Sequence, residues 1–368
     1  MSLTKSLISR RFISAFPSEL RALSSHQALS GPSSSIFAIP GRVHTTFNQG
    51  RRSLTTSSST HPNSVESTKW KHYKADVGSA DIYAFLEPVT SSWQYIVADP
   101  TTRDAVVIDP VLDYNPASGT LSTTAADTLL EFIREKNLSV VRILETHAHA
   151  DHLTASQYIK RMLGGKAPIC IGERIKQLQG HFAPVYGLES TDFVKSFDVF
   201  LKDEEVFTLG SSISGKVIHL PGHTPDHIGY MIGKAVFTGD SIFMPDLGSA
   251  RADFPGGNAK DLFSSMTRLL SLPEDYQLFV GHDYPVGREH DCMATVGVHQ
   301  MMNKHGKLGI TESQFIQFRE ARDKVLGAPR LLHPSLQVNI RAGKLPPASN
   351  GRVWLKTPTK LSNPNIPL

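Results

Sequence analysis

The sequence has few of the features that mark several common protein classes. Only two of its 368 residues are cysteine, Cys170 and Cys292, which excludes a disulfide-rich scaffold and a zinc finger built on thiolates. No apolar run reaches the length of about 18 residues that a membrane-spanning helix needs, so no membrane association is expected. With 40% apolar and 20% charged residues, the composition is that of a globular protein, and the chain is long enough for one large core or two smaller ones.

Positive charge is also scarce outside the N-terminus. Residues 1–60 contain seven Lys and Arg and a single acid, Glu19, so their net charge is +6. The net charge of the whole chain is +4, and the remaining 308 residues therefore carry −2. This balance excludes the extended basic surface of a nucleic-acid-binding domain, and no nucleic-acid partner is expected. The N-terminal 60 residues also hold 21 Ser and Thr. An Arg-rich, Ser-rich and acid-poor segment is typical of a mitochondrial transit peptide.

We therefore predict a disordered transit peptide over residues 1–62, a folded domain over 63–350 and a C-terminal tail over 351–368. The first segment predicts location in the mitochondrial matrix, and the alternative is a disordered tail without a targeting role.

From about residue 70 the chain alternates short strands and helices. Aromatic and β-branched runs between polar turns predict strands at 81–86, 93–97, 105–108, 140–146, 168–171, 216–220, 230–232, 235–238 and 277–280. Helical spacing of apolar residues predicts helices from Thr124, over 153–163, after the strand at 168–171, over 259–272 and over 311–325. Strands followed by mixed helices and strands, twice over, favour an α+β fold: two mixed β-sheets packed face to face with helices outside.

A histidine-rich loop follows the strand predicted at 140–146. In Thr146-His147-Ala148-His149-Ala150-Asp151-His152, four side chains within six positions can bind a metal. Histidine is the commonest transition-metal ligand, and functional residues concentrate on loops held by rigid elements. The alternative interpretation is a polar surface loop with incidental histidines, although the full pattern H-x-H-x-D-H is rare by chance.

Three more candidate ligands follow predicted strands. Leu220-Pro221-Gly222-His223-Thr224 presents His223, Phe237-Thr238-Gly239-Asp240-Ser241 presents Asp240, and Val280-Gly281-His282-Asp283 presents His282. A single His or Asp at the end of a strand is more often structural than a ligand. Four such groups in one chain predict a metal centre.

The order H-x-H-x-D-H, P-G-H-T, T-G-D and G-H-D resembles the ligand set of the metallo-β-lactamase superfamily, from about residue 72 to residue 300. The resemblance implies an αββα sandwich with metals at one edge, between the sheets. By motif position it implies a first site of His147, His149 and His223, and a second site of Asp151, His152 and His282 with Asp240 bridging.

Within the superfamily, Phe243–Gly257 resembles the G-x-x-R-x-D-F segment of persulfide dioxygenases, in their longer bacterial-type branch. His282-Asp283-Tyr284 and Val338–Gly343 resemble that family's H-D-Y and N-M-R-x-G. The resemblance implies an enzyme that oxidises glutathione persulfide with O₂ to sulfite and glutathione at one Fe(II) per chain, with zinc as the alternative metal. Ala252 and Ser249 differ from some members, which affects fine substrate contacts rather than the metal site.

In that family the iron ligands correspond to His147, His223 and Asp240. Two imidazoles and one carboxylate leave three open positions, as in non-haem Fe(II) oxygenases. The remaining candidates either orient ligands and water or hold a second metal; they are His149, Asp151, His152 and His282.

The resemblance also implies substrate contacts. Arg251 and Tyr284 match the family's glutathione contacts, and Arg341 is a further candidate cation. The alternative for Arg251 is an ion pair with Asp253. Arginine can bind a carboxylate through two hydrogen bonds, and glutathione carries two carboxylates.

Two rival functions remain at this stage. A thioester hydrolase of the glyoxalase II type would use the same seven ligands with two metals, and a metal-binding module or redox sensor would use them without turnover. A homodimer is left open. Of the cysteines, Cys170 is expected in the core and Cys292 at the surface, and the other histidines considered are expected to be superficial or structural: His290, His299, His305 and His333.

Overall fold

The computed structural model describes residues 70–74 and 79–359, all of which belong to the compact unit Ser64–Leu368. The predicted transit peptide at 1–62 lies outside the described residues, and the predicted tail at 351–368 is described only as far as residue 359. No helix in the described part of the chain has the length and apolar character needed to cross a membrane.

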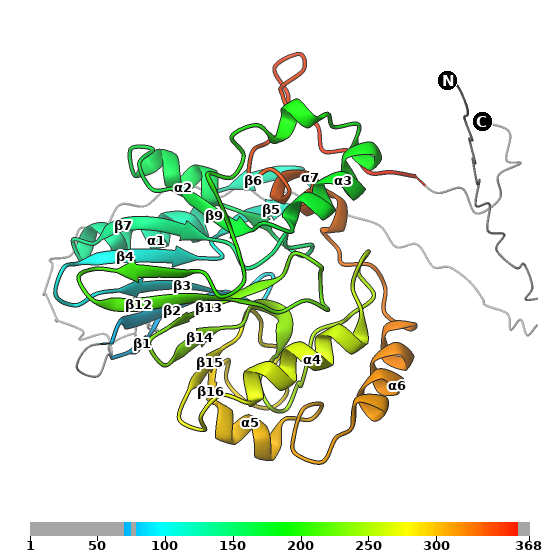
Figure 1. The fold of residues 1–368 in the computed structure, drawn as a ribbon. Helices are drawn as coiled ribbons and strands as arrows, with labels where there is room; N and C mark the ends of the chain where they lie inside the picture. Colours follow the sequence, from blue (N-terminus) through cyan, green and yellow to red (C-terminus); the bar gives the residue numbers. More distant parts are fainter. Residues whose placement is uncertain (1–69, 75–78, 360–368) are drawn as a thin grey trace, which may run out of the picture. The chain divides into compact units, whose positions relative to one another are not determined.

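Two β-sheets lie face to face in the middle of this unit (Figure 1). The first has seven strands in the order β1-β2-β3-β4-β7-β9-β10. Their bounds are β1 Trp70–Tyr73, β2 Asp81–Glu87, β3 Ser92–Ala98, β4 Asp104–Ile108, β7 Ser139–Leu144, β9 Ile169–Gly172 and β10 Val199–Leu201. The second has six strands in sequence order, β11 to β16. Their bounds are β11 Val206–Leu209, β12 Ile213–His219, β13 Ile228–Ile232, β14 Ala235–Phe237, β15 Gln277–Phe279 and β16 Met293–Thr295.

Helices cover the outer face of each sheet (Figure 1). The first sheet is covered by α1 Thr124–Glu135, α2 Ser156–Met162, α3 Ile175–Tyr186 and α7 Leu332–Asn339. The second is covered by α4 Ala259–Leu270, α5 Val296–Met302 and α6 Glu312–Asp323. Short elements complete the unit: a small sheet of β6 Thr120–Ser122, β5 Val111–Asn115 and β8 Leu153–Thr154, and the 3₁₀ turns η1 Ser190–Phe193 and η2 Gly239–Ser241. The predicted α+β sandwich of two sheets between helices is confirmed.

Strand β2 shows why the sandwich has three layers of core. Ile82 and Ala84 point into the cluster between the two sheets, whereas Tyr83 and Phe85 point into the cluster under α1. Successive side chains of a strand alternate between faces, so a sheet covered on both sides is apolar at nearly every position. The uninterrupted apolar run therefore encodes a central layer rather than a half-exposed sheet.

The predicted elements differ from the structure mainly around the histidine-rich loop. The strand predicted over 140–146 ends at Leu144, and the helix predicted over 153–163 begins only at Ser156. Leu153 and Thr154 instead pair antiparallel with Leu112 and Val111 of β5. The loop is thus held between two strands.

Strand direction places the ligand loops together. In the second sheet β14 is parallel to β15 and antiparallel to β13, which is itself antiparallel to β12. The ends of β12, β14 and β15 therefore share one edge, and each is followed by a segment that carries a predicted ligand.

Candidate metal centre

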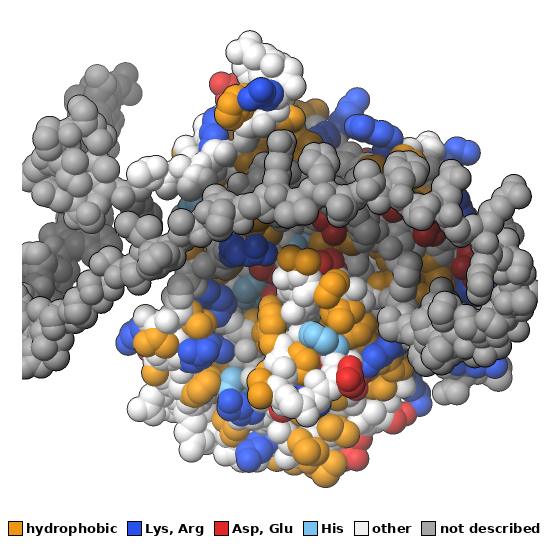
Figure 2. Space-filling view, turned by 180° about the vertical axis from the view of Figure 1, so that it is seen from behind, with side chains coloured by type: hydrophobic (Ala, Val, Ile, Leu, Met, Phe, Trp, Pro, Cys, Tyr) orange, Lys and Arg blue, Asp and Glu red, His pale blue; other side chains and the backbone are white. Residues whose placement is uncertain are grey.

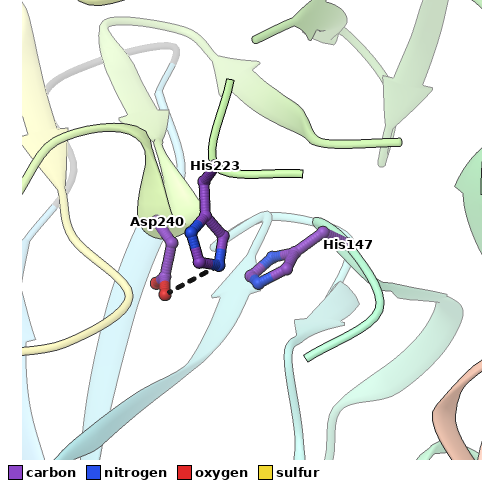
Figure 3. A group of neighbouring side chains, drawn as sticks. All are labelled: His147, His223 and Asp240. Atoms are coloured by element: carbon purple, nitrogen blue, oxygen red, sulfur yellow. Dashed lines mark ion pairs between the residues drawn. The ribbon is translucent and has the colours of Figure 1, made fainter. Parts of the chain in front are cut away.

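Three predicted ligands meet at this edge. His147, His223 and Asp240 come from the segments after β7, β12 and β14, and their donor atoms all lie within 4.8 Å of one another (Figure 3). Nε2 of His223 is 3.7 Å from Oδ2 of Asp240, and the His147 and His223 ring centroids are 5.1 Å apart. All three side chains are buried. Two imidazoles and a carboxylate at this spacing can hold one cation.

A glycine permits the turn that presents His223. Gly222 has φ +131°, and a Cβ atom there would lie 2.2 Å from the backbone nitrogen of Leu262. Any larger residue would collide with the start of α4, so the P-G-H-T sequence is a steric requirement at this close approach.

Hydrogen bonds fix the tautomers of both imidazoles. Nδ1 of His223 donates to the carbonyl of Arg251 at 2.8 Å, which leaves the Nε2 lone pair free. The Thr146 hydroxyl donates to Asp109 at 2.8 Å, so it accepts from Nδ1 of His147 at 3.0 Å. Nε2 of His147 and Oδ1 of Asp240 are buried and have no hydrogen-bond partner among the described residues. Buried atoms that have a free lone pair and no hydrogen-bond partner are suited to binding a metal.

His227 supports the centre from behind. Its Nε2 accepts from the backbone N–H of Asp240 at 2.9 Å, and its ring stacks on that of His147 at 4.6 Å. Burial lowers the pKa of His227 well below its usual range, which keeps the ring neutral and able to accept. The sequence analysis missed this residue, although P-G-H-T-P-D-H places it four residues after His223.

The other four predicted ligands lie beside the triad. Donor atoms of His149, Asp151 and His152 lie within 4.8 Å of one another. Nε2 of His282 is 3.2 Å from Oδ2 of Asp151 and 3.5 Å from Oδ1 of Asp240. Asp240 thus has an imidazole on each side. All seven residues predicted from the sequence are brought together, with enough donors for one metal or two.

Two buried acids that the sequence analysis missed hold His149. Its Nε2 lies 3.2 Å from Asp109 and 3.6 Å from Glu145. Burial opposes a charged ring, but these carboxylates outweigh it and raise the pKa of His149 well above its usual range. When the ring carries a single proton, on Nε2 facing these acids, Nδ1 is the atom left to bind a metal, and it is buried without a hydrogen-bond partner in the described structure. Each acid ends a strand as a single polar residue, which is a weak signal in a sequence.

Asn339 ties the histidine-rich loop to the last helix. Its amide nitrogen donates to the carbonyls of His149 at 2.8 Å and His152 at 2.7 Å, and its amide oxygen accepts from the Thr154 N–H at 2.9 Å. Asn339 is buried at the end of α7. The segment Val338–Gly343, which resembles N-M-R-x-G, therefore holds the backbone of the histidine-rich loop in place.

A cavity of about 630 Å³ opens onto Asp151, His223 and Asp240. Its wall includes Arg251 and Tyr284, which are two of the three predicted substrate contacts. Further lining residues include Phe243, Leu247, Lys304, His305, Phe318, Arg319, Arg322 and Arg330. The cavity joins the triad to a wall rich in cations.

The three predicted substrate contacts have different surroundings. Arg251 pairs with Asp253 at 2.5 and 2.7 Å, so the alternative ion pair is present. Arg251 also lines the cavity, and its contact with a substrate stays a prediction. Tyr284 is half-exposed, and its ring is parallel to that of His282 at 5.8 Å. Arg341 is not brought to the cavity: it is buried, and its Nε donates to the carbonyl of Gln337 at 2.9 Å.

The expectation that Cys292 is exposed was wrong. Both cysteines are fully buried, and Sγ of Cys292 is 3.2 Å from the hydroxyl of Tyr73. Cys292 adjoins edge strand β16, and Tyr73 of β1 covers it. His299 and His305 are buried as well.

Comparisons with known proteins agree with this geometry. A family model described as the metallo-beta-lactamase superfamily matches residues 88–282. A "beta-lactamase hydrolase-like protein" of Xylella fastidiosa is 45% identical over 280 residues, 75% of this chain but only 64% of its own length. "Glyoxylase B2" of Dictyostelium discoideum is 43% identical over 284 residues, 76% of this chain and 97% of its own.

More distant similarities include a named dioxygenase. Human "persulfide dioxygenase ETHE1, mitochondrial" is 27% identical over 267 residues, 72% of this chain and 89% of its own. The crystal structure of ETHE1 from Myxococcus xanthus superposes with a TM-score of 0.57 and 28% identity, covering 72% of this chain and 99% of that one. Fold, ligand geometry and family model agree, and the chain belongs to the metallo-β-lactamase superfamily.

Proposed function

We propose that this member of the superfamily is a glutathione persulfide dioxygenase, which oxidises the sulfane sulfur of glutathione persulfide with O₂ to sulfite and glutathione. The observation that carries the proposal is the convergence of His147, His223 and Asp240 below a cavity lined by cations. The segment from Phe243 to Gly257 and the likeness to human persulfide dioxygenase support it. The coarser assignment, a metal-dependent enzyme of this superfamily, does not depend on the choice of substrate.

The triad fits a single Fe(II). His147 and His223 would bind it through Nε2 and Asp240 through its carboxylate, because these atoms converge and the Nδ1 atoms are already hydrogen bonded. When bound, Fe(II) supplies redox chemistry and open positions for the persulfide sulfur and O₂. The protein's own contribution is to keep both imidazoles neutral and aimed, and to hold the substrate over them.

Proton transfer has candidate groups next to the triad. Asp151 lines the cavity and lies 3.2 Å from His282, and burial is outweighed there by the neighbouring histidines, which lower the pKa of Asp151 to about 2. A carboxylate that stays ionised can orient the water that releases sulfite. His149, protonated toward Asp109, is the second group able to hold that water in place.

One observation favours a second candidate function, a glyoxalase II-type hydrolase of hydroxyacylglutathione thioesters with two metals. His149, Asp151, His152 and His282 are all in place for a second ion beside the triad. The 43% identity with "Glyoxylase B2" points the same way. Both candidates act on glutathione conjugates, so the cavity suits either.

Anaerobic purification, metal analysis and oxygen-electrode assays separate the two. The dioxygenase predicts about one iron per chain and O₂ uptake that depends on glutathione persulfide. Two zinc ions per chain, with release of thiol from S-lactoylglutathione at the same rate without oxygen, would overturn it in favour of the hydrolase.

We also propose that residues 1–62 direct the protein to the mitochondrial matrix, on the basis of their Arg-rich, acid-poor composition. A fluorescent protein fused to residues 1–62 should enter mitochondria and be shortened there. A fusion that stays in the cytosol at full length would refute this.

A further inference from the structure

We infer that Arg322 and Arg330 bind the carboxylates of the thiol substrate and so select anionic thiol conjugates of the glutathione type. This deepens the proposed function and rests on it for the identity of the reacting group. The inference comes from which cations of the cavity wall are already paired and which are not.

The wall contains five cations: Arg251, Lys304, Arg319, Arg322 and Arg330. Two of them form ion pairs within the protein. Arg251 forms its ion pair with Asp253, and Arg319 pairs with Asp323 at 2.7 Å. Arg319 also donates to the carbonyl of Ala250 at 2.9 Å. Paired guanidinium groups of this kind hold the wall together and have few donors left for a ligand.

The third cation, Lys304, lies near Asp246, an acid that is also paired with Arg288. Lys304 lies in the field of Asp246, where it helps to lower the pKa of that carboxyl. The main partner of Asp246 is Arg288, which contacts it at 2.7 Å. Lys304 therefore adds positive charge to the cavity but has a carboxylate close by.

Arg322 and Arg330 differ from the other three. Both line the cavity, and neither guanidinium forms a hydrogen bond or an ion pair with any residue in the described part of the chain. Lys and Arg side chains gather among hydrophobic ones at the left of Figure 2. Figure 2 is seen from behind, so its left side is the side on which α6 lies at the right of Figure 1. An unpaired guanidinium facing a cavity is suited to a carboxylate, which it can bind through two parallel hydrogen bonds.

Both arginines line the same cavity as the metal ligands, on a different segment of the chain. Arg322 lies near the end of α6 and Arg330 just before α7, on the wall formed by residues 318–330, whereas Asp240 and His223 lie at the floor. A cavity of about 630 Å³ has the volume of a small-molecule site. A ligand with its sulfur at the floor would direct its charged ends at this wall.

Arg330 also stands between two cavities. A second cavity of about 430 Å³ is lined by His152, and it shares Val89, Thr90 and Arg330 with the first. From this position Arg330 can bind a carboxylate in either cavity, which makes it the stronger candidate of the pair.

Arg251 has a different task. Its Nε and Nη2 donate to Asp253, its Nη1 donates to the carbonyl of Gly327 at 2.8 Å, and its own carbonyl accepts from His223. It thus links the metal ligand His223 to the segment that carries Arg330. We assign Arg251 as a positioning residue.

Kinetics with two matched substrates test the inference. Arg330→Ala, Arg322→Ala and the double variant are compared with Arg161→Ala, an exposed arginine of α2 that lines neither cavity. The substrates are glutathione persulfide and the persulfide of glutathione diethyl ester, which lacks both carboxylates. Each single variant should raise KM for the acid about tenfold, since a charged hydrogen bond contributes roughly 1.5 kcal/mol or more.

Other readouts isolate the role of charge. Iron content, kcat and KM for the diester should stay unchanged, and Arg330→Lys should recover part of the loss. An unchanged KM for the acid in the double variant, or an equal loss with the diester, would overturn the inference.

Direct binding separates this inference from the proposed function. If no variant, including wild type, consumes oxygen, calorimetry with S-methylglutathione still applies, because that ligand does not react. Binding that is weakened in the double variant and unchanged in Arg161→Ala supports the two arginines even when the dioxygenase proposal has failed. Equal binding by all three proteins rejects them.

Discussion

The floor and the wall of the large cavity are built on opposite principles. At the floor, the imidazole Nδ1 atoms of His147, His223 and His282 are each within hydrogen-bond distance of a partner, at 3.0, 2.8 and 3.2 Å. On the wall, Arg322 and Arg330 are exposed and unpaired among the described residues. Fixed geometry suits a metal, whereas free charge suits a mobile ligand. Under our proposals, the metal chemistry belongs to the floor and substrate choice to the wall.

The floor should respond most strongly to loss of a ligand. Asp240→Ala removes the carboxylate of the triad, so we expect loss of iron and a decrease in turnover of about a thousandfold or more. Metal analysis and oxygen uptake measure both. Asp275→Ala, which removes an exposed partner of Lys234, is the matched control and should behave as wild type. Normal iron content in Asp240→Ala would remove it from the centre.

The support of the floor should come next. Asn339→Ala leaves the carbonyls of His149 and His152 and the N–H of Thr154 buried without partners. We expect about 3 kcal/mol less free energy of unfolding, measured in urea, together with weaker metal binding. Asn339→Asp keeps only the acceptor, so it should restore little. Wild-type metal affinity in both variants would contradict a positioning role.

A histidine in the wall predicts a pH dependence. Burial, then Arg319 and Lys304, lower the pKa of His305 to about 4, and its Nδ1 accepts from the Ser249 N–H at 3.0 Å. The unfolded chain takes up this proton near pH 6.5, whereas the folded chain takes it up only near pH 4, so stability falls as the pH drops from about 6.5 to 4.

The slope from this one group should reach about 1.4 kcal/mol per pH unit. His305→Asn, which retains an acceptor for Ser249, should remove that share of the slope. Urea unfolding of both proteins across this range measures it, and parallel curves would show that His305 does not contribute.

The smallest effect is expected at Arg251. Arg251→Ala breaks a partly exposed ion pair with Asp253 and the contact to Gly327, which together contribute about 1 kcal/mol. KM should rise only a few-fold, with the acid and the diester affected alike. If KM for the acid rose more in Arg251→Ala than in Arg330→Ala, and KM for the diester did not rise, these two arginines would have the opposite roles.

The sequence predicted the floor far better than the wall. The seven ligand candidates stand in short motifs after strands, and strand direction alone brings them to one edge. Asp109, Glu145 and His227 escaped prediction because a single buried polar residue leaves no pattern in a sequence. Arg322 and Arg330 escaped because a cation facing a cavity looks like any cation on a solvated surface until helix α6 is placed in space.

The sandwich itself was predictable from short apolar runs between polar turns, but its short elements were not. β8 has two residues and pairs with β5 across about 40 positions of sequence, and such long-range pairing overrides local helical spacing at Leu153. Arg341 shows the converse limit, since likeness to a family motif located the segment but not the direction of its side chain.

The hydrogen bonds of Asn339 also impose an order of events on biosynthesis. A ribosome makes the histidine-rich loop some 190 residues before the amide that fixes its backbone. A nascent chain halted before α7 would have the ligands but not their final arrangement. We therefore expect metal capture to follow the docking of α7.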